Sequence, residues 1–227
     1  WVGWNFPSAI AVPTDFPNSV RGANHTSNTQ STTFLMASRK ELARAMKRLG
    51  DEIRAYDNVE NETFLFLRPV NDEDLLHWEA VLKGPAGSAY EGKATKSTKA
   101  KIPSCGYVSQ SNVTTGGLWH LSIEIPPKYP FAPPTIIFTN KILHPNIDFN
   151  EGKICLSVLT SEHWTPAGNL ETTLRAIQQL LTDPNPDSPL NVEISVLLRK
   201  GDIAGYESLV RYLTEEQRWE EPRNPRR

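Results

Sequence analysis

The chain has only two cysteines, Cys105 and Cys155, among 227 residues. Two cysteines cannot form the several disulfide bridges of a small secreted scaffold, and so low a content is typical of a reducing compartment. The three Asn-x-Thr triplets would be glycosylation acceptors only in a secreted protein, so they carry little weight. A functional role for a single thiol is compatible with this content.

Long apolar runs and blocks of one charge are also missing. Residues 1–13 are apolar but are interrupted by Pro7 and Pro13, and they are shorter than the roughly 20 residues that a membrane span needs. The formal net charge is -2, without a long basic or acidic block. We therefore expect no nucleic-acid partner and no direct membrane insertion, and partners must be inferred from local sites.

Breaks in composition divide the chain. Residues 1–35 are rich in Ser, Thr, Asn, Pro and Gly without a sustained period, which predicts an irregular leader. Residues 36–217 have the pattern of one domain, followed by a short polar tail at 218–227. Inside the domain, the Lys-, Ser-, Thr- and Gly-rich residues 93–116 predict a loop inserted in a hairpin. We hypothesise that the leader is upstream sequence translated in error and that the insert is a retained intron.

Apolar spacing predicts the first elements of the domain. Ser38 and Glu41 fit a capping box, and the apolar residues that follow have helical spacing, which predicts an amphipathic helix over 38–57 with a basic outer face. Short or alternating apolar runs then predict strands over 63–67, 77–82, 118–125 and 135–139.

A helical set follows the strands. Asn169, Asn191 and Asp202 are the predicted N-caps of helices over 170–181, 192–199 and 203–217, and Gly201 lies where a helix-ending glycine is expected. One helix, four sequential strands and then helices predict an α+β fold. In this fold a four-stranded antiparallel meander sheet packs against an N-terminal helix and C-terminal helices.

Cys155 and Asn146 are the residues with the clearest chemical potential. A thiolate is a good nucleophile, and its thioester stays activated toward amines and thiols. Asn146 offers a neutral NH₂ donor for a developing oxyanion. Each also has an ordinary explanation, because free cysteines are commonly buried and asparagine after proline is commonly a turn residue. Nothing in the sequence orders His163 as a base for Cys155, and we assign Cys105 no catalytic role.

Together, these residues resemble the signature of ubiquitin-conjugating enzymes. The resemblance runs from residue 38 to residue 217. The motifs that carry it are His77-Trp78-Glu79-Ala80, Lys83-Gly84-Pro85, Tyr90-Glu91-Gly92 rejoining Gly117, Tyr129-Pro130-Phe131-Ala132-Pro133-Pro134, His144-Pro145-Asn146, Ile154-Cys155-Leu156, Trp164-Thr165-Pro166-Ala167 and Asp183-Pro184-Asn185-Pro186-Asp187-Ser188-Pro189-Leu190. The resemblance implies the ubiquitin-conjugating fold and an E2 transferase activity.

Catalytic roles are implied residue by residue. Cys155 would accept ubiquitin as a thioester from the activating enzyme and pass it on with a RING-type ligase. ATP is used upstream, so no metal or organic cofactor is implied. Asn146 would support the oxyanion, pin the loop before the cysteine, or do both, and His144 would shape that loop. Ser188 stands where the family often has an aspartate beside the attacking nucleophile, and Asp187 is the nearest carboxylate.

Partner surfaces are implied as well. Arg44 and Lys47 match positions where the family meets the activating enzyme and RING-type ligases, and Phe131, Pro166 and Ala167 match ligase-binding positions. The structural alternatives are a solvated basic face, a core aromatic and a loop turn.

Further motifs resemble the peroxisomal, peroxin-4 type of fungi. They are Leu143-His144-Pro145-Asn146 with one residue more than usual before Cys155, Ser161-Glu162-His163-Trp164-Thr165-Pro166, Asp187-Ser188-Pro189-Leu190-Asn191-Val192-Glu193-Ile194 and Arg199-Lys200-Gly201-Asp202-Ile203-Ala204-Gly205-Tyr206. This resemblance implies a cytoplasmic enzyme that a membrane-anchored peroxin recruits to the cytosolic face of the peroxisome. There it would modify the cycling import receptor, on a cysteine, for its recycling.

Three alternatives stay open. They are a general cytosolic E2 for ubiquitin or another ubiquitin-like modifier, a non-catalytic ubiquitin-binding scaffold, and a cysteine hydrolase.

Overall fold

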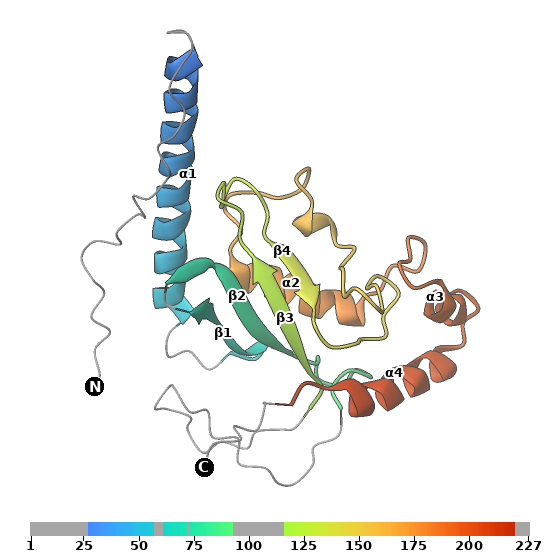
Figure 1. Ribbon diagram of the computed structural model, residues 1–227. Helices are drawn as coiled ribbons and strands as arrows, with labels where there is room; N and C mark the ends of the chain where they lie inside the picture. The colour runs from blue at the N-terminus through green and yellow to red at the C-terminus, as the bar shows by residue number, and fades with distance from the viewer. Residues whose placement is uncertain (1–26, 57–60, 72, 93–115, 221–227) are drawn as a thin grey trace, which may run out of the picture. The chain divides into compact units, whose positions relative to one another are not determined.

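The computed structural model describes residues 27–56, 61–71, 73–92 and 116–220 (Figure 1). The chain divides between residues 37 and 38 into two units, and the fold below is that of the second. The elements are α1 (Ser27–Tyr56), β1 (Phe64–Asn71), β2 (Asp74–Lys83), β3 (Leu118–Glu124), β4 (Thr135–Phe138), the 3₁₀ helix η1 (Ser157–Leu159), α2 (Leu170–Thr182), α3 (Val192–Arg199) and α4 (Ile203–Gln217). The predicted α+β architecture is confirmed.

The four strands form one antiparallel sheet in the order β1-β2-β3-β4, which confirms the predicted meander. Trp78, Ala80 and Leu82 alternate along β2 and are buried. Ala80 lies opposite Leu121, and Leu121 lies opposite Phe138. Because successive side chains of a strand point to opposite faces, this register gathers the large apolar residues of neighbouring strands on one face of the sheet.

Helix α2 covers that face, and Figure 1 shows it behind β3 and β4. Leu170, Leu174, Ile177 and Leu181 are buried along α2 at helical spacing, and they belong to the same apolar cluster as the inward residues of the strands. Full burial of one such side chain contributes about 1.5–3 kcal/mol. The core therefore lies between the sheet and α2, beneath the segment that carries Cys155.

The C-terminal helices begin where their caps predicted. The side chains of Asn169, Asn191 and Asp202 accept hydrogen bonds from the backbone N–H three residues on, which satisfies donors that helix ends otherwise leave free. Gly201 follows the C-cap of α3 with φ +75°, a conformation that glycine adopts without strain. These four predictions are confirmed.

The predicted start of the first helix was wrong. Helix α1 begins at Ser27 rather than at Ser38, so Ser38 lies inside the helix and cannot be its N-cap. Residues 27–37 contain neither proline nor glycine, so nothing in the backbone stops the helix before Ser38. Residues 1–26 of the predicted irregular leader lie outside the described residues.

The hairpin between β2 and β3 closes at Gly92 and Gly117. The backbone N–H of Gly117 donates a hydrogen bond to the carbonyl of Glu91 at 2.5 Å. Gly92 has φ +69°, and a Cβ added there would lie 2.6 Å from the nitrogen of Gly117, so only glycine fits this close approach. The predicted insert lies outside the described residues apart from Gly116, and Cys105 lies outside them.

Trp219 packs on the outer face of the sheet, immediately after α4. Its backbone N–H donates to the carbonyl of Leu118 at 2.7 Å. Its ring stacks on His120, with centroids 6.0 Å apart, and meets Phe66 edge-on at 5.9 Å. Val81 pairs with both Phe66 and His120 and is 0% exposed. The first residues of the predicted polar tail therefore pack against the outer face of the sheet, which their composition did not indicate.

Candidate active site

Cys155 lies in an irregular segment between β4 and η1, with its side chain exposed. Its backbone N–H donates a hydrogen bond to the carbonyl of Asn146 at 2.8 Å. The preceding residue, Ile154, forms an antiparallel bridge with Ile147. The segment with the cysteine is therefore held beside the His144-Pro145-Asn146 motif by backbone hydrogen bonds, while the sulfur remains accessible. The buried-hydrophobe explanation of Cys155 is excluded.

His144 is a buried, neutral ring. It is 0% exposed; its Nε2–H donates to the carbonyl of Leu180 at 2.9 Å, and its Nδ1 accepts from the backbone N–H of Asn146 at 3.0 Å. These partners fix the Nε2–H tautomer. Burial lowers the pKa of His144 to about 4, because the charged form would lose its hydration. A ring so enclosed shapes the loop and does not exchange protons with a substrate.

The side-chain amide of Asn146 is fully occupied. Its Nδ2 donates to the carbonyl of Asn185 at 2.8 Å and to that of Ser188 at 3.1 Å, and its Oδ1 accepts from the backbone N–H of Asn185 at 2.8 Å. The residue is 2% exposed. These contacts favour the loop-pinning role for Asn146. To stabilise an oxyanion, the amide would have to release one of its two carbonyl partners.

Ser188 and Asp187 lie in the segment that Asn146 holds, and both side chains are exposed. The backbone N–H of Asp187 donates to the side-chain oxygen of Asn185 at 3.0 Å. The same segment is tied to Pro145, whose carbonyl accepts from Leu190 and from the next residue. The fold thus brings Ser188 and Asp187 to the cysteine-bearing segment through the motif between them.

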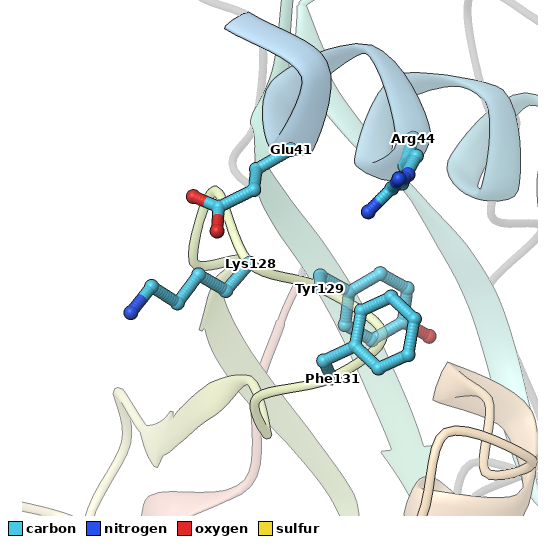
Figure 2. A pocket seen from close by; sticks show the side chains of 5 residues that line it. All are labelled: Glu41, Arg44, Lys128, Tyr129 and Phe131. Atoms are coloured by element: carbon cyan, nitrogen blue, oxygen red, sulfur yellow. The ribbon is translucent and has the colours of Figure 1, made fainter. Parts of the chain in front are cut away.

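Two of the predicted partner residues line one pocket, which Figure 2 shows. Arg44 extends from α1 toward the rings of Tyr129 and Phe131, and Glu41 and Lys128 complete the lining. Phe131 is 66% exposed, so it is not a core aromatic. No partner-binding role was predicted for Glu41, Lys128 or Tyr129, although Glu41 and Tyr129 belong to motifs named above.

The other three predicted partner residues lie outside this pocket. Lys47, on α1, and Pro166 and Ala167, in the turn before α2, are all exposed. A partner that meets all five predicted residues would therefore have to extend beyond the pocket.

Metal and membrane features are absent from the part of the chain that the structure describes. No group of three or more His, Cys, Asp or Glu side chains there could hold a metal ion. Among the same residues, no helix is both long and apolar enough to cross a membrane.

Comparison with known proteins gives a consistent result. A family model of ubiquitin-conjugating enzymes matches residues 107–214. Ubiquitin-conjugating enzyme E2 16 of Schizosaccharomyces pombe is 36% identical over 170 residues, which cover 75% of this chain and 91% of that protein. Ubiquitin-conjugating enzyme E2 pex4 of Dictyostelium discoideum is 36% identical over 164 residues, or 71% of this chain and 93% of that protein.

A solved structure agrees with these relatives. The H. polymorpha ubiquitin-conjugating enzyme Pex4p, solved in complex with the soluble domain of Pex22p, matches with a TM-score of 0.61 at 28% identity. The match covers 76% of this chain and 97% of that one. This chain therefore belongs to the ubiquitin-conjugating enzyme family and is an E2 enzyme. Within the family it is similar to members of the peroxisomal, peroxin-4 type.

The buried ring of His144 predicts a pH-dependent stability. The unfolded ring has a pKa near 6.5 and the folded one about 4, so between these values the unfolded chain binds more protons. Stability is therefore lost as the pH falls. We expect His144 to lower the free energy of unfolding by about 3 kcal/mol between pH 7 and pH 4, measured by urea unfolding.

The matched variants are His144→Gln and His163→Gln. The first should lose this part of the pH dependence. The second, at an exposed histidine, should keep it. Equal pH profiles for wild type and His144→Gln would contradict the assignment.

Proposed function

We propose that Cys155 accepts ubiquitin as a thioester from the activating enzyme and transfers it, with a RING-type ligase, to a protein substrate. The observation that carries the proposal is the exposed sulfur of Cys155 on a segment fixed by backbone bonds to Asn146. An acyl carrier needs a thiol that large partners can reach, placed on a rigid backbone. Family membership supports the same role.

The chemistry is two acyl exchanges at one sulfur. The Cys155 thiolate attacks the carbonyl of the ubiquitin thioester on the activating enzyme, and the thiolate of that enzyme leaves. In the second exchange a substrate nucleophile attacks the new thioester and the Cys155 thiolate leaves, while the proton of the nucleophile passes to a base or to solvent. Each exchange passes through an oxyanion, which a nearby amide donor such as Asn146 would stabilise.

Ser188 and Asp187 are proposed to border the path of the incoming nucleophile. Both are exposed on the segment held by Asn146. Ser188 is a hydroxyl and cannot act as a carboxylate base, so Asp187 is the nearest residue able to take a proton from a lysine. A thiol acceptor ionises far more readily than an amine, and this suits a site with serine at position 188.

The partner surfaces are proposed from the exposed residues. Arg44 and Lys47 on α1 would meet the activating enzyme and the ligase, and Phe131 with Pro166 and Ala167 would meet the ligase. An exposed aromatic beside an exposed turn is typical of a binding surface, because large apolar side chains that stay exposed often mark interaction sites.

The peroxisomal role is proposed from the relatives. Pex4p was solved with the soluble domain of Pex22p, which supports a membrane-anchored peroxin as a partner of this chain. The enzyme would then act at the cytosolic face of the peroxisomal membrane with RING peroxins. Its substrate would be the cycling import receptor, modified for recycling. The second candidate is a general cytosolic E2 for ubiquitin or another ubiquitin-like modifier.

A charging assay tests the carrier role. With activating enzyme, ubiquitin and ATP, wild type should form an adduct that a thiol reductant removes, because a thioester is cleaved by thiols. Cys155→Ser should form no such adduct and at most a thiol-resistant oxyester. The products are separated by non-reducing and reducing gel electrophoresis.

Matched controls separate the alternatives. Cys105→Ser should charge like wild type, and other ubiquitin-like modifiers with their own activating enzymes should not charge Cys155. A wild-type chain that binds ubiquitin without an adduct would be a scaffold, and release of free ubiquitin without an acceptor would indicate a hydrolase.

A second variant separates the two roles of Asn146. Asn146→Ala should lower the free energy of unfolding by about 1–3 kcal/mol, because it leaves buried backbone groups without partners. If the amide also stabilises the oxyanion, discharge of the pre-formed thioester to a small amine should fall about 10²-fold at a temperature where the variant is folded. Discharge at the wild-type rate would leave Asn146 with the loop-pinning role alone.

Binding to the anchor tests the peroxisomal role. The whole chain should bind the purified soluble domain of the membrane-anchored peroxin from the same organism with a Kd of about 1 μM or tighter, measured by calorimetry. Cys155→Ser should bind equally well, since the anchor is not expected to use the sulfur. A chain that charges with ubiquitin but does not bind this domain would be the general cytosolic enzyme.

A further inference from the structure

Glu52 is a buried carboxylate that none of the roles above uses. It lies on the inner side of α1 and is 5% exposed. Its Oε1 accepts from Arg48 Nε at 2.7 Å and from the Tyr129 hydroxyl at 2.6 Å. Its Oε2 accepts from the Tyr56 hydroxyl and from the backbone N–H of Leu170, both at 3.0 Å. Four donors on two oxygens are the pattern that an ionised carboxylate accepts.

Two of the four partners of Glu52 belong to α1 itself, and the other two come from segments with predicted ligase-binding residues. Tyr129 lies two residues before Phe131. Leu170 begins α2, directly after the turn with Pro166 and Ala167. Arg48 ties the same turn a second time, because its Nη2 donates to the carbonyl of Gly168 at 2.9 Å.

The two segments also contact each other. The indole N–H of Trp164 donates to the carbonyl of Pro130 at 2.7 Å, and the rings of Trp164 and Tyr129 lie 6.1 Å apart. Burial and the negative charge of Glu52 raise the pKa of Tyr129, so its hydroxyl keeps its proton and remains a donor. Phe131 on one segment and Pro166 and Ala167 on the other are exposed above this buried network.

We infer that Glu52, with Arg48 and Tyr129, sets the spacing between the Phe131 segment and the Pro166-Ala167 turn, and thereby sets the affinity for a RING-type ligase. This inference rests on the proposed function of those exposed residues. A partner that bridges both segments requires their geometry to be held within about 0.5 Å, which buried hydrogen bonds behind a surface provide. Glu52, Arg48 and Tyr129 are positioning residues, since neither of the two acyl exchanges at Cys155 involves any of them.

The test measures discharge of ubiquitin-charged protein against the concentration of the recombinant RING domains of the RING peroxins. Glu52→Gln and Tyr129→Phe should raise the half-saturating RING concentration by about three- to thirtyfold, the range for residues that act on a site without touching the ligand. The rate at saturating RING and the rate of charging by the activating enzyme should stay unchanged.

The matched control is Glu207→Gln. It breaks an exposed pair on α4, Arg211 with Glu207 at 2.8 Å, and should leave the half-saturating concentration unchanged.

If Glu52→Gln does not fold, Tyr129→Phe tests the inference by itself, because it removes one hydroxyl and keeps the ring. Variants with lower melting temperatures but wild-type half-saturation would show a structural role only and overturn the inference. A wild type that the RING domains do not stimulate would overturn the proposed ligase dependence and this inference with it.

Discussion

The candidate active site depends on the hydrogen bonds of one residue, Asn146. Through its carbonyl, the backbone of Asn146 holds the N–H of Cys155, and through its side chain it holds Asn185 and Ser188. The buried side-chain amide of Asn146 favours this one arrangement of the two segments. Each hydrogen bond lost from it would leave a buried polar group without a partner, which costs about 1–3 kcal/mol. The cysteine segment and the 185–188 segment are therefore fixed to each other by one residue.

The two residues before Asn146 hold the same region by different means. His144 donates to the carbonyl of Leu180, in the last turn of α2, which also accepts from the backbone N–H of Asp183 at 3.2 Å. The carbonyl of Pro145 accepts from Leu190 and Asn191. Three consecutive residues thus tie the 180–191 stretch through an imidazole, a backbone oxygen and an amide. Replacing His144 or Asn146 would release a different part of that stretch, whereas the contact at position 145 is made by the backbone and does not depend on the side chain.

Local chemistry made most of the fold predictable. Each helix cap could be predicted because the side chains of Asn169, Asn191 and Asp202 bond only the first turn of their own helix. The strands could be predicted because apolar and polar residues alternate when one face of a strand is buried. The start of α1 was not predictable in the same way. Ser38 and Glu41 fit a capping box, but a capping box starts a helix only if the residues before it are not helical. No proline or glycine in residues 27–37 prevents them from being helical.

The long-range polar contacts could not be predicted from the sequence. Glu52 bonds Tyr129, which is 77 residues away, and Leu170, which is 118 residues away. On a helical pattern a glutamate at that position is simply a charged residue near an apolar stripe. The candidate cysteine and its motif were found because their residue types are specific, whereas the network beneath the surface has no local signature. Such networks become visible only when the chain folds distant segments around one carboxylate.

Helix α1 has two different faces. Arg44 and Lys47 are exposed on one side, and Ala45, Leu49 and Glu52 are buried on the other. Glu52 joins this inner face to the hydroxyl of Tyr129 and to the backbone N–H of Leu170, at the start of α2. The exposed face of the helix, the Phe131 segment and the Pro166-Ala167 turn are therefore connected through the hydrogen bonds of one buried carboxylate, although the three lie far apart in the sequence.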